Sequence, residues 1–488
     1  MPPAGVAPGD AVEAAPGRGL GLVLAVAVLA AAVMAIVALS VHFGYPYDIE
    51  PGEGDRIYTA LRLLRGEPLY SKGSDFPYLY NVYPPVYALA VAPLVATLGP
   101  VLAAGRLVSL LGTLGASVVL ARWLRDRGAG PPLQAAGAVG FAACVMLVPY
   151  QLSCRPDALA AWAGCGTLAY ADAIRRRNLG HGHLTLLAGL GLVASFTRQS
   201  MPLLVVAALA SLWPSRRWRA AAALAGCGCV GLALVLMLDH VTAGAFWASI
   251  TSTVSWSRRA PEKWAFLVFY FLLSQWGWTL LVMGGVTTAA MRRAVPPAAW
   301  LGLLAASYEA LGITRAGAAA NYLLPFHFFM VTIGALVAAE TIRRGSRRWS
   351  MVATVVVAAQ LAHDAVQLRF EARAVPPWGL AAARSLEAAL RPIPGPMLLD
   401  RQTEMWLRLG RLDHFVEVAG LGLDVLHGGG HTEPLQAFIR AGGYSRIVLR
   451  RHTLLPGRVL DAVRVGYRET GRVRLFDDEY VILAPAPR

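Results

Sequence analysis

Long apolar blocks separated by short arginine-rich turns dominate the chain, and this alternation strongly restricts its possible folds. Blocks of about 17–25 apolar residues match the thickness of a bilayer, and in lipid only helices or closed barrels satisfy the backbone. Charged residues make up 15% of the sequence, compared with about 25% in soluble domains. The pattern therefore predicts an all-α polytopic membrane protein with about eleven transmembrane helices.

The apolar blocks define the predicted crossings, and the first is too long for the apolar core of a signal peptide. Residues 83–98 are apolar but rich in proline, and we assign them to an interfacial or re-entrant segment. Two short blocks are separated by Thr197-Arg-Gln-Ser200, a polar break that must face water or a cavity. The predicted crossings are 20–41, 101–122, 133–150, 157–174, 184–196, 200–214, 219–239, 264–290, 297–314, 322–341 and 350–367.

The net charge of +15 is concentrated in arginine clusters at the ends of these blocks. Such clusters mark cytoplasmic helix ends and contact anionic lipid, so nucleic acid is not an expected partner. If residues 1–19 are a cytoplasmic tail, every cluster lies inside and the transmembrane domain spans 20–367. Residues 368–488 then form an extracytoplasmic domain. The clusters lie at 122–127, 175–177, 216–219, 292–293 and 343–348.

The first outer loop, residues 42–100, is rich in acid: Asp48, Glu50, Glu53 and Asp55 lie within eight residues. Residues 53–65 carry apolar positions that suit a short helix on the membrane surface, ended by Gly66. One interpretation is a solvated acidic turn that caps this helix. The other is a general base that takes a proton from an acceptor hydroxyl within hydrogen-bond reach.

The C-terminal part, from about residue 390, alternates helix and strand patterns. Segments 396–400 and 444–449 are typical of buried strands, and 472–485 of a strand or hairpin, so we expect a small α/β domain. The five cysteines lie in or beside apolar blocks without the spacing of metal ligands, which favours packing. The sequence contains no Gly-x4-Gly-Lys-Ser/Thr loop, so nucleotide-driven transport is not expected.

An ordered series of short motifs resembles the bacterial C-type (GT-C) glycosyltransferases, most closely the members similar to dolichyl-phosphate-mannose protein mannosyltransferases (family 39-like). The resemblance covers roughly residues 20–345. The motifs are Asp48-Ile-Glu50 with Gly52-Glu53-Gly54, Gly66-Glu-Pro-Leu-Tyr70, Tyr83-Pro-Pro-Val-Tyr87, Gly105-Arg-Leu-Val-Ser109, Arg155-Pro-Asp157, Thr197-Arg-Gln-Ser200, and Arg315 to Pro325 with Asn321-Tyr322.

This resemblance implies a GT-C membrane core with a catalytic acid in the first outer loop. The donor would be a sugar on a polyprenyl phosphate, and the acceptor a glycan, lipid or protein at the outer face of a bacterial inner membrane. Glu53 is our first choice as the base and Asp48 the second, with Glu50 and Asp55 as further candidates. No cofactor is implied, although the acidic cluster could bind a divalent cation.

A phosphate leaving group needs cationic partners, and several polar residues are predicted near the outer face. Snorkelling to the interface is the alternative for arginines beside membrane helices. Glu309 is either a functional group or the structural partner of an arginine, and for His327 we favour packing. The predicted substrate-binding residues are Tyr83, Arg155, Arg198, Lys263, Arg315, Asn321 and Tyr322.

Two other functions fit part of the pattern. A transporter or flippase of lipid-linked sugars would share the helices, but it favours inverted repeats and charges at the bilayer midplane. We find no such repeat, and the unusual charges lie on the outer side. A non-catalytic scaffold would leave the acidic loop unexplained. The sequence therefore favours a transferase.

Overall fold

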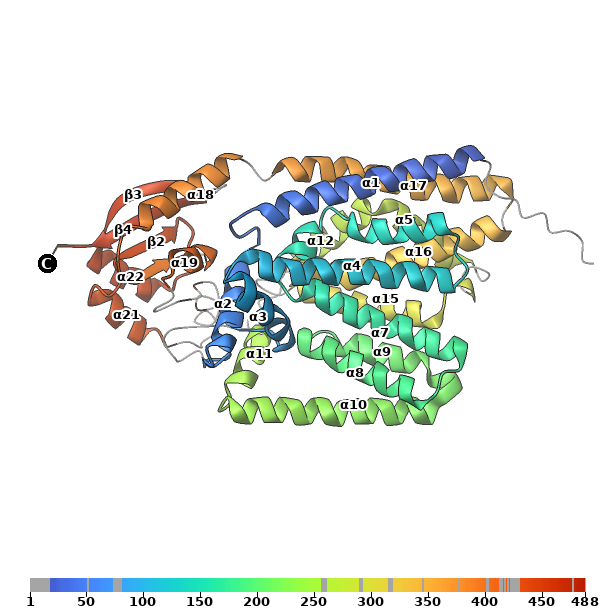
Figure 1. The fold of residues 1–488 in the computed structure, drawn as a ribbon, viewed down its shortest axis with the longest axis horizontal. Helices are drawn as coiled ribbons and strands as arrows, with labels where there is room; N and C mark the ends of the chain where they lie inside the picture. Colours follow the sequence, from blue (N-terminus) through green and yellow to red (C-terminus); the bar gives the residue numbers. More distant parts are fainter. Residues whose placement is uncertain are drawn as a thin grey trace, which may run out of the picture.

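The computed structural model describes residues 18–50, 52–72, 81–255, 261–288, 293–314, 319–344, 346–374, 377–400, 403–411, 416, 418, 421, 431–475 and 478–487. A bundle of long helices forms one end of the molecule, and a smaller domain with a sheet forms the other (Figure 1). The predicted all-α membrane architecture with a C-terminal α/β domain is confirmed.

The bundle is built from helices that run roughly along one axis (Figure 1), and α1 packs along the late helix α17. The short helices α2 and α3 occupy the first outer loop, close to the C-terminal domain. The helices are α1 (Arg18–Gly44), α2 (Glu53–Leu64), α3 (Val86–Leu98), α4 (Leu102–Asp126), α5 (Pro131–Ala142), α6 (Val148–Leu152), α7 (Asp157–Arg177), α8 (His181–Thr197), α9 (Pro202–Ser211), α10 (Trp213–Val241), α11 (Ala245–Ser255), α12 (Pro261–Ser274), α13 (Trp276–Thr287), α15 (Pro297–Ala310), η1 (Leu311–Thr314), η2 (Ala320–Leu323), α16 (Leu324–Arg344) and α17 (Arg347–Ala374).

Five helices in the described part of the chain are long and apolar enough to cross a membrane. A sixth candidate is the pair α12 and α13, which is bent by 93°. The other predicted crossings correspond to helices that are shorter or more polar, such as α8 and α9. The count of about eleven crossings and the outer position of residues 368–488 stay predictions.

Two predicted helices are broken in the structure. The segment 133–150 consists of α5 and α6, and the amide of Gln151 donates to the freed carbonyl of Phe141 at 2.7 Å. The segment 264–290 bends at Gln275, where Gln360 of α17 accepts from the N–H of Gly277 at 2.8 Å. Lipid offers no such partners, so these breaks exist because polar side chains satisfy the backbone.

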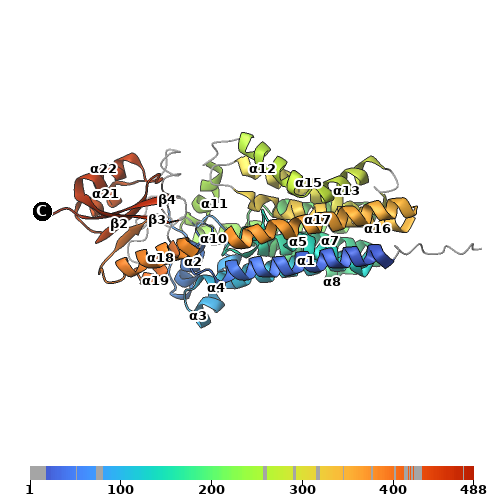
Figure 2. The same ribbon diagram turned by 90° about the horizontal axis from the view of Figure 1, so that it is seen from above.

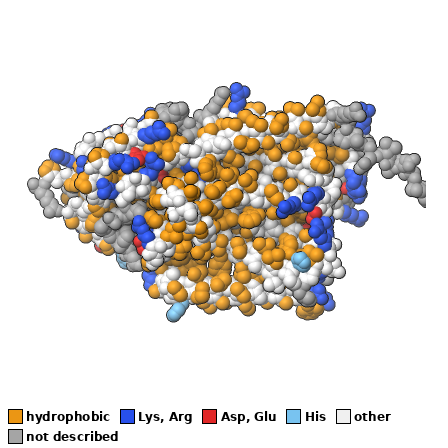
Figure 3. All heavy atoms as spheres, viewed as in Figure 1, with side chains coloured by type: hydrophobic (Ala, Val, Ile, Leu, Met, Phe, Trp, Pro, Cys, Tyr) orange, Lys and Arg blue, Asp and Glu red, His pale blue; other side chains and the backbone are white. Residues whose placement is uncertain are grey.

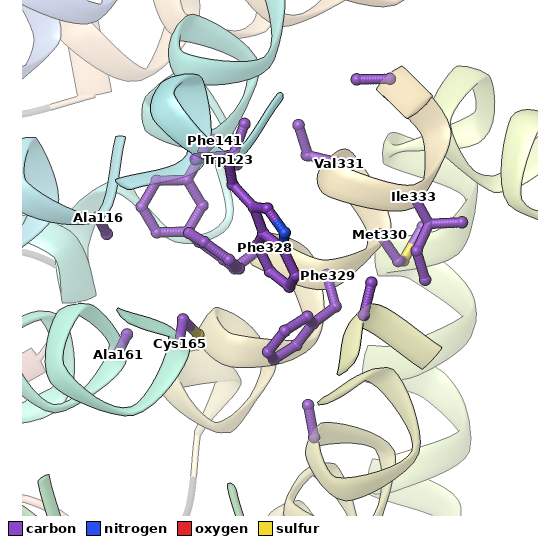
Figure 4. Packing of buried hydrophobic residues seen from close by; sticks show 14 of the residues in the cluster. Ala116, Trp123, Phe141, Ala161, Cys165, Phe328, Phe329, Met330, Val331 and Ile333 are labelled. Atoms are coloured by element: carbon purple, nitrogen blue, oxygen red, sulfur yellow. The ribbon is translucent and has the colours of Figure 1, made fainter. Parts of the chain in front are cut away.

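The membrane core is packed by alanine, leucine and aromatic side chains. Trp123 lies against Phe328 and Phe329, with ring centroids 6.4 Å from each (Figure 4). Phe141 stacks on His327 at 5.8 Å, and the imidazole lies within hydrogen-bond distance of the Gly140 carbonyl, 3.1 Å away. The packing role favoured for His327 therefore agrees with its surroundings.

The C-terminal domain contains a four-stranded sheet in the order β1-β2-β4-β3. β1 and β2 are parallel and the remaining pairs antiparallel, and β3 and β4 form the predicted hairpin. Figure 2 shows α21 and α22 on one side of the sheet and α18 and α19 on the other. The elements are α18 (Pro377–Leu390), β1 (Met397–Leu399), α19 (Thr403–Leu409), α21 (Glu433–Arg440), β2 (Arg446–Arg450), α22 (Gly457–Gly466), β3 (Tyr467–Leu475) and β4 (Asp478–Pro485).

The first outer loop and the C-terminal domain share one hydrophobic cluster. Tyr47 and Ile57 of the loop belong to the same buried set as Leu386, Met405 and Trp406 of the domain. The hydroxyl of Tyr47 also donates to Glu387 of α18 at 3.0 Å. The C-terminal domain therefore packs against the acidic loop and helps to hold it in place.

Apolar and charged side chains are separated on the surface of the molecule. In Figure 3 a wide hydrophobic area covers the side of the bundle, with Lys and Arg gathered at its far end and on the C-terminal domain. Large apolar side chains of the bundle such as Leu22, Val26 and Leu236 are more than half exposed. Such an apolar band between two charged ends is what lipid contact requires.

Candidate functional site

The acidic loop is anchored by a buried ion pair between α2 and α4. Glu53 and Arg106 are both fully buried, and the guanidinium donates twice, from Nε at 3.0 Å and Nη2 at 2.8 Å. The remaining acceptor positions of Glu53 take the backbone N–H groups of Ile49 at 2.7 Å and Cys154 at 2.8 Å. All this bonding fixes the carboxylate and keeps it away from solvent.

Arg106 also binds the backbone that leads into the loop. Its Nη1 donates to the carbonyls of His42, at 3.0 Å, and Tyr45, while Nη2 donates to Tyr47 at 2.7 Å. Arg106 lies in the Gly105-Arg-Leu-Val-Ser109 motif, but no role was predicted for it from the sequence. A charged residue inside an apolar helix usually has a buried partner or a function, so the position of Arg106 in the sequence was a usable signal.

Asp48 and Asp55 also support the loop. Oδ1 of Asp48 accepts from the N–H of Gly54 at 3.1 Å, at the start of α2. The Asp55 carboxylate lies close to Gly52, where an added Cβ would be 3.0 Å from Oδ2, and the positive φ of 91° at this position also favours glycine. Asp55 is 4% exposed, so both residues help to shape the turn before α2.

A carboxyl group of the C-terminal domain reaches this turn. Glu404 of α19 is buried, and burial raises its pKa to about 7. Burial, together with the nearby charge of Glu404, raises the pKa of Asp48 well above its ordinary value. Glu404 was not predicted as a site residue, because it is far from the loop in the sequence and no motif surrounds it.

Glu50 is the loop carboxylate that faces the predicted binding residues. Its Oε2 lies 3.4 Å from Nη1 of Arg155, and about a fifth of its side chain is exposed. Burial raises the pKa of Glu50 above its ordinary value, against the opposing charge of Arg155. Arg155 also donates to the hydroxyl of Tyr83 at 3.1 Å and to Asp157 at 3.2 Å.

Further ion pairs connect Arg155 to the helices of the bundle through Asp157. Oδ1 of Asp157, the first residue of α7, accepts from the Asn321 amide at 2.8 Å and lies 3.2 Å from Nη1 of Arg198. The same Arg198 nitrogen lies 2.9 Å from Glu309, which also accepts from Ser200 at 2.8 Å. We call Glu50, Arg155, Asp157, Arg198 and Glu309 the ion-pair network.

Arg198 keeps unused bonding capacity. Its guanidinium lies over the ring of Tyr322, 4.2 Å from the centroid, and the side chain is 2% exposed. Nη2 makes no hydrogen bond within the described part of the chain. A buried donor without an acceptor costs about 1–3 kcal/mol, so this nitrogen is a candidate contact for a bound anionic group.

Six of the eleven predicted site residues lie together around Asp157, which was not among them. They are Glu50, Tyr83, Arg155, Arg198, Asn321 and Tyr322. Lys263 lies in the first turn of α12, which packs on η1. Arg315 lies outside the described residues. The described residues contain no group of three or more His, Cys, Asp or Glu able to hold a metal ion.

Comparisons with known proteins identify the fold. No family model matches the chain, and no curated protein matches it. Two solved structures of ArnT from Cupriavidus metallidurans do. The apo structure has a TM-score of 0.60 at 15% identity, covering 94% of this chain and 97% of that one. The structure bound to undecaprenyl phosphate has a TM-score of 0.57 at 14% identity, covering 96% and 98%.

The similarity extends over nearly the full length of both chains, so the membrane bundle and the C-terminal domain both belong to the shared fold. The chain therefore shares the fold of these ArnT structures, which agrees with the membrane core expected from the sequence motifs.

Proposed function

We propose that the chain is a membrane glycosyltransferase that moves a sugar from a polyprenyl-phosphate donor to an acceptor at the outer face of a bacterial inner membrane. The shared fold supports this, since one of the similar structures, ArnT, holds undecaprenyl phosphate. The acceptor would be a glycan, a lipid or a protein. The network of buried ions beside the acidic loop supplies the polar groups that such a reaction needs.

In the proposed reaction, an acceptor hydroxyl attacks the anomeric carbon of the donor sugar. A loop carboxylate takes the hydroxyl proton, the new glycosidic bond forms, and the bond to phosphate breaks with its electron pair leaving on phosphate. Attack opposite the leaving group inverts the anomeric centre. A general base must reach the hydroxyl directly and have a pKa near the working pH.

Glu50 meets these conditions best among the four predicted carboxylates. It is partly exposed, its pKa is raised by burial, and it lies beside Arg155 and Tyr83. Glu53, our first choice from the sequence, is fully buried and has its oxygens engaged by four donors. We therefore propose Glu50 as the base and Glu53 as the anchor of the loop.

The same network would bind the donor. Arg155 and the unused Nη2 of Arg198 are proposed to stabilise the phosphate as its charge develops. We propose that the sugar is contacted by Tyr83, Asn321 and Tyr322. Tyr83 accepts a hydrogen bond from Arg155, Asn321 donates to Asp157, and the ring of Tyr322 lies under the Arg198 guanidinium. Lys263, on the helix α12 that packs on η1, stays a proposed binding residue, and so does Arg315.

One observation carries the proposal: Glu50, a partly exposed carboxylate of raised pKa, lies at the end of a buried ion-pair network in which, among the described residues, a guanidinium N–H of Arg198 has no acceptor. Burying three carboxylates and two guanidinium groups is costly unless the groups are well paired or used by a substrate. The Arg198 Nη2 group, which has no hydrogen-bond acceptor within the described residues, is therefore the proposed contact for the donor phosphate.

The test is sugar transfer by the purified protein in vesicles, with labelled polyprenyl-phosphate sugars and a panel of acceptors. We expect transfer by the wild type and a loss of about 10²–10⁴-fold in Glu50→Gln. The matched control is Glu67→Gln in the same loop, a partly exposed acid that pairs with Arg62 at 3.4 Å and with Arg65 at 3.8 Å. Movement of the donor across the vesicle without transfer would instead establish a transporter.

A further inference from the structure

A crevice runs along the side of the bundle, outside the ion-pair network. It has a volume of about 370 Å³ and lies between α4, α7 and α8. On α7 its lining extends from Leu159 to Ala173, about 21 Å at 1.5 Å per residue. Pockets of about 300–1,000 Å³ accept small-molecule ligands, and this one has the length for an extended hydrocarbon chain.

The walls of the crevice are apolar and shaped by small residues. Gly166 lies at its floor, where an added Cβ would meet only Val119, at 3.9 Å. Trp162 forms part of the rim and is 43% exposed, as is Val193 on the facing helix. Gly115 lets the indole of Trp162 lie across α4, because a Cβ there would be 2.8 Å from its Nε1. The crevice therefore opens sideways, toward lipid.

One end of the crevice carries a cation. Arg122 lines it and is exposed, and within the described part of the chain no hydrogen bond or ion pair of this side chain is found. The other charged lining residue, Asp126, already pairs with Arg176 at 2.8 Å and Arg177 at 3.0 Å. Arg122 is thus the cation at this mouth whose charge remains available to a ligand.

We propose that the crevice binds an anionic glycerophospholipid of the inner leaflet, with one acyl chain between α4, α7 and α8 and its phosphate on Arg122. The mouth lies at the end of the bundle remote from the C-terminal domain, where Lys and Arg gather (Figure 3). The positive-inside rule assigns that end to the cytoplasm. Charge complementarity favours an anionic headgroup there, and the apolar walls favour its tail.

The proposed sugar donor is a different ligand. Its phosphate would lie beside Arg155 and Arg198, near the first residue of α7, whereas Arg122 contacts the crevice at the last turns of α4 and α7. The two positions are separated by most of the length of α7. The lipid site therefore does not depend on the proposed transferase activity.

The test measures lipid retention by native mass spectrometry of the full chain, titrated with phosphatidylglycerol or phosphatidylcholine. We expect tighter binding of phosphatidylglycerol. Arg122→Gln should reduce its affinity about fivefold, since one arginine near an anionic surface contributes about 1 kcal/mol, and should leave phosphatidylcholine unchanged. Arg125→Gln is the matched control, because it is exposed on the same turn but does not line the crevice.

A second pair of variants tests the crevice itself. Gly166→Leu fills the floor, and Val193→Trp narrows the opening from the facing helix; each should weaken both lipids. Two variants on different helices keep the test valid if one fails to fold. Equal effects of Arg122→Gln and Arg125→Gln would overturn the proposal, and so would unchanged binding in both crevice variants. Competition by polyprenyl phosphate at equal affinity would overturn it as well.

Discussion

The buried pair of Glu53 and Arg106 yields the sharpest prediction. Arg106→Met removes the guanidinium and leaves Glu53 fully buried, with only the N–H groups of Ile49 and Cys154 as donors. Removing one partner of a buried ion pair costs about 3–5 kcal/mol. The carbonyls of His42, Tyr45 and Tyr47 lose their donor as well, so we expect the upper part of that range.

The measurement is denaturant unfolding of the purified protein in detergent micelles, under conditions where refolding is reversible. Arg122→Met is the control, since this exposed arginine should change the free energy of unfolding by no more than about 0.5 kcal/mol. Glu53→Gln should be destabilised like Arg106→Met, because it leaves a buried guanidinium without a charge partner. Sugar transfer per folded Glu53→Gln molecule should remain near the wild-type rate.

Two results would refute this reasoning. If Glu53→Gln unfolds like the wild type and loses transfer by about 10²–10⁴-fold, Glu53 is the base, as the sequence suggested. If the double variant Arg106→Met with Glu53→Gln is destabilised by the sum of the two single changes, the two side chains do not interact. Contacting residues should instead show a coupling energy of about 0.5–3 kcal/mol.

Three further predictions concern other parts of the molecule. Burial raises the folded-state pKa of Glu404 to about 7, so the folded state binds more protons above the unfolded pKa and stability should fall as pH rises toward 7; unfolding measured against pH should lose this slope in Glu404→Gln. Asp364→Leu should destabilise by about 1–3 kcal/mol for each amide N–H that loses its acceptor. The Gln275 and Gln360 amides both donate to Oδ1 of Asp364 at 3.0 Å and would keep their bonds to the Ser274 carbonyl. Asp364→Asn should be tolerated in the same unfolding assay. Single cysteines placed at Glu67 and in α22 of a cysteine-free variant should both react with an impermeant thiol reagent in intact cells, and reaction at one alone would invert the predicted topology.

Local pattern was sufficient for much of the fold. The surface helix predicted at 53–65 is α2, and Gly66 follows it with a φ of 69°, because apolar spacing and a left-handed glycine are local signals. The strands predicted at 396–400 and 444–449 are β1 and β2, and the predicted hairpin is β3 with β4. The bounds of these elements are set by residues close together in the sequence, so the local pattern was enough to predict them.

Contacts between distant residues could not be predicted in this way. The bend at Gln275 lies inside an apolar run, and only Gln360, far along the chain, makes it possible. Glu404 approaches Asp48 from a helix of the C-terminal domain, and nothing in either local segment indicates the other. The choice of Glu53 as base had the same weakness, because its engagement by Arg106 depends on how α2 packs on α4.

The position of the ion-pair network bears on the choice between transferase and transporter. Asp157 begins α7, Arg198 directly follows α8, and Glu309 lies at the end of α15. Because successive antiparallel helices place such termini at the same end of a bundle, the charges meet at that end and not halfway along the helices. A carrier that moves its substrate across the membrane is expected to hold polar groups near the midplane. A network confined to helix ends beside the acidic loop instead suits a reaction at one face, where a lipid-linked donor and an outer acceptor can meet.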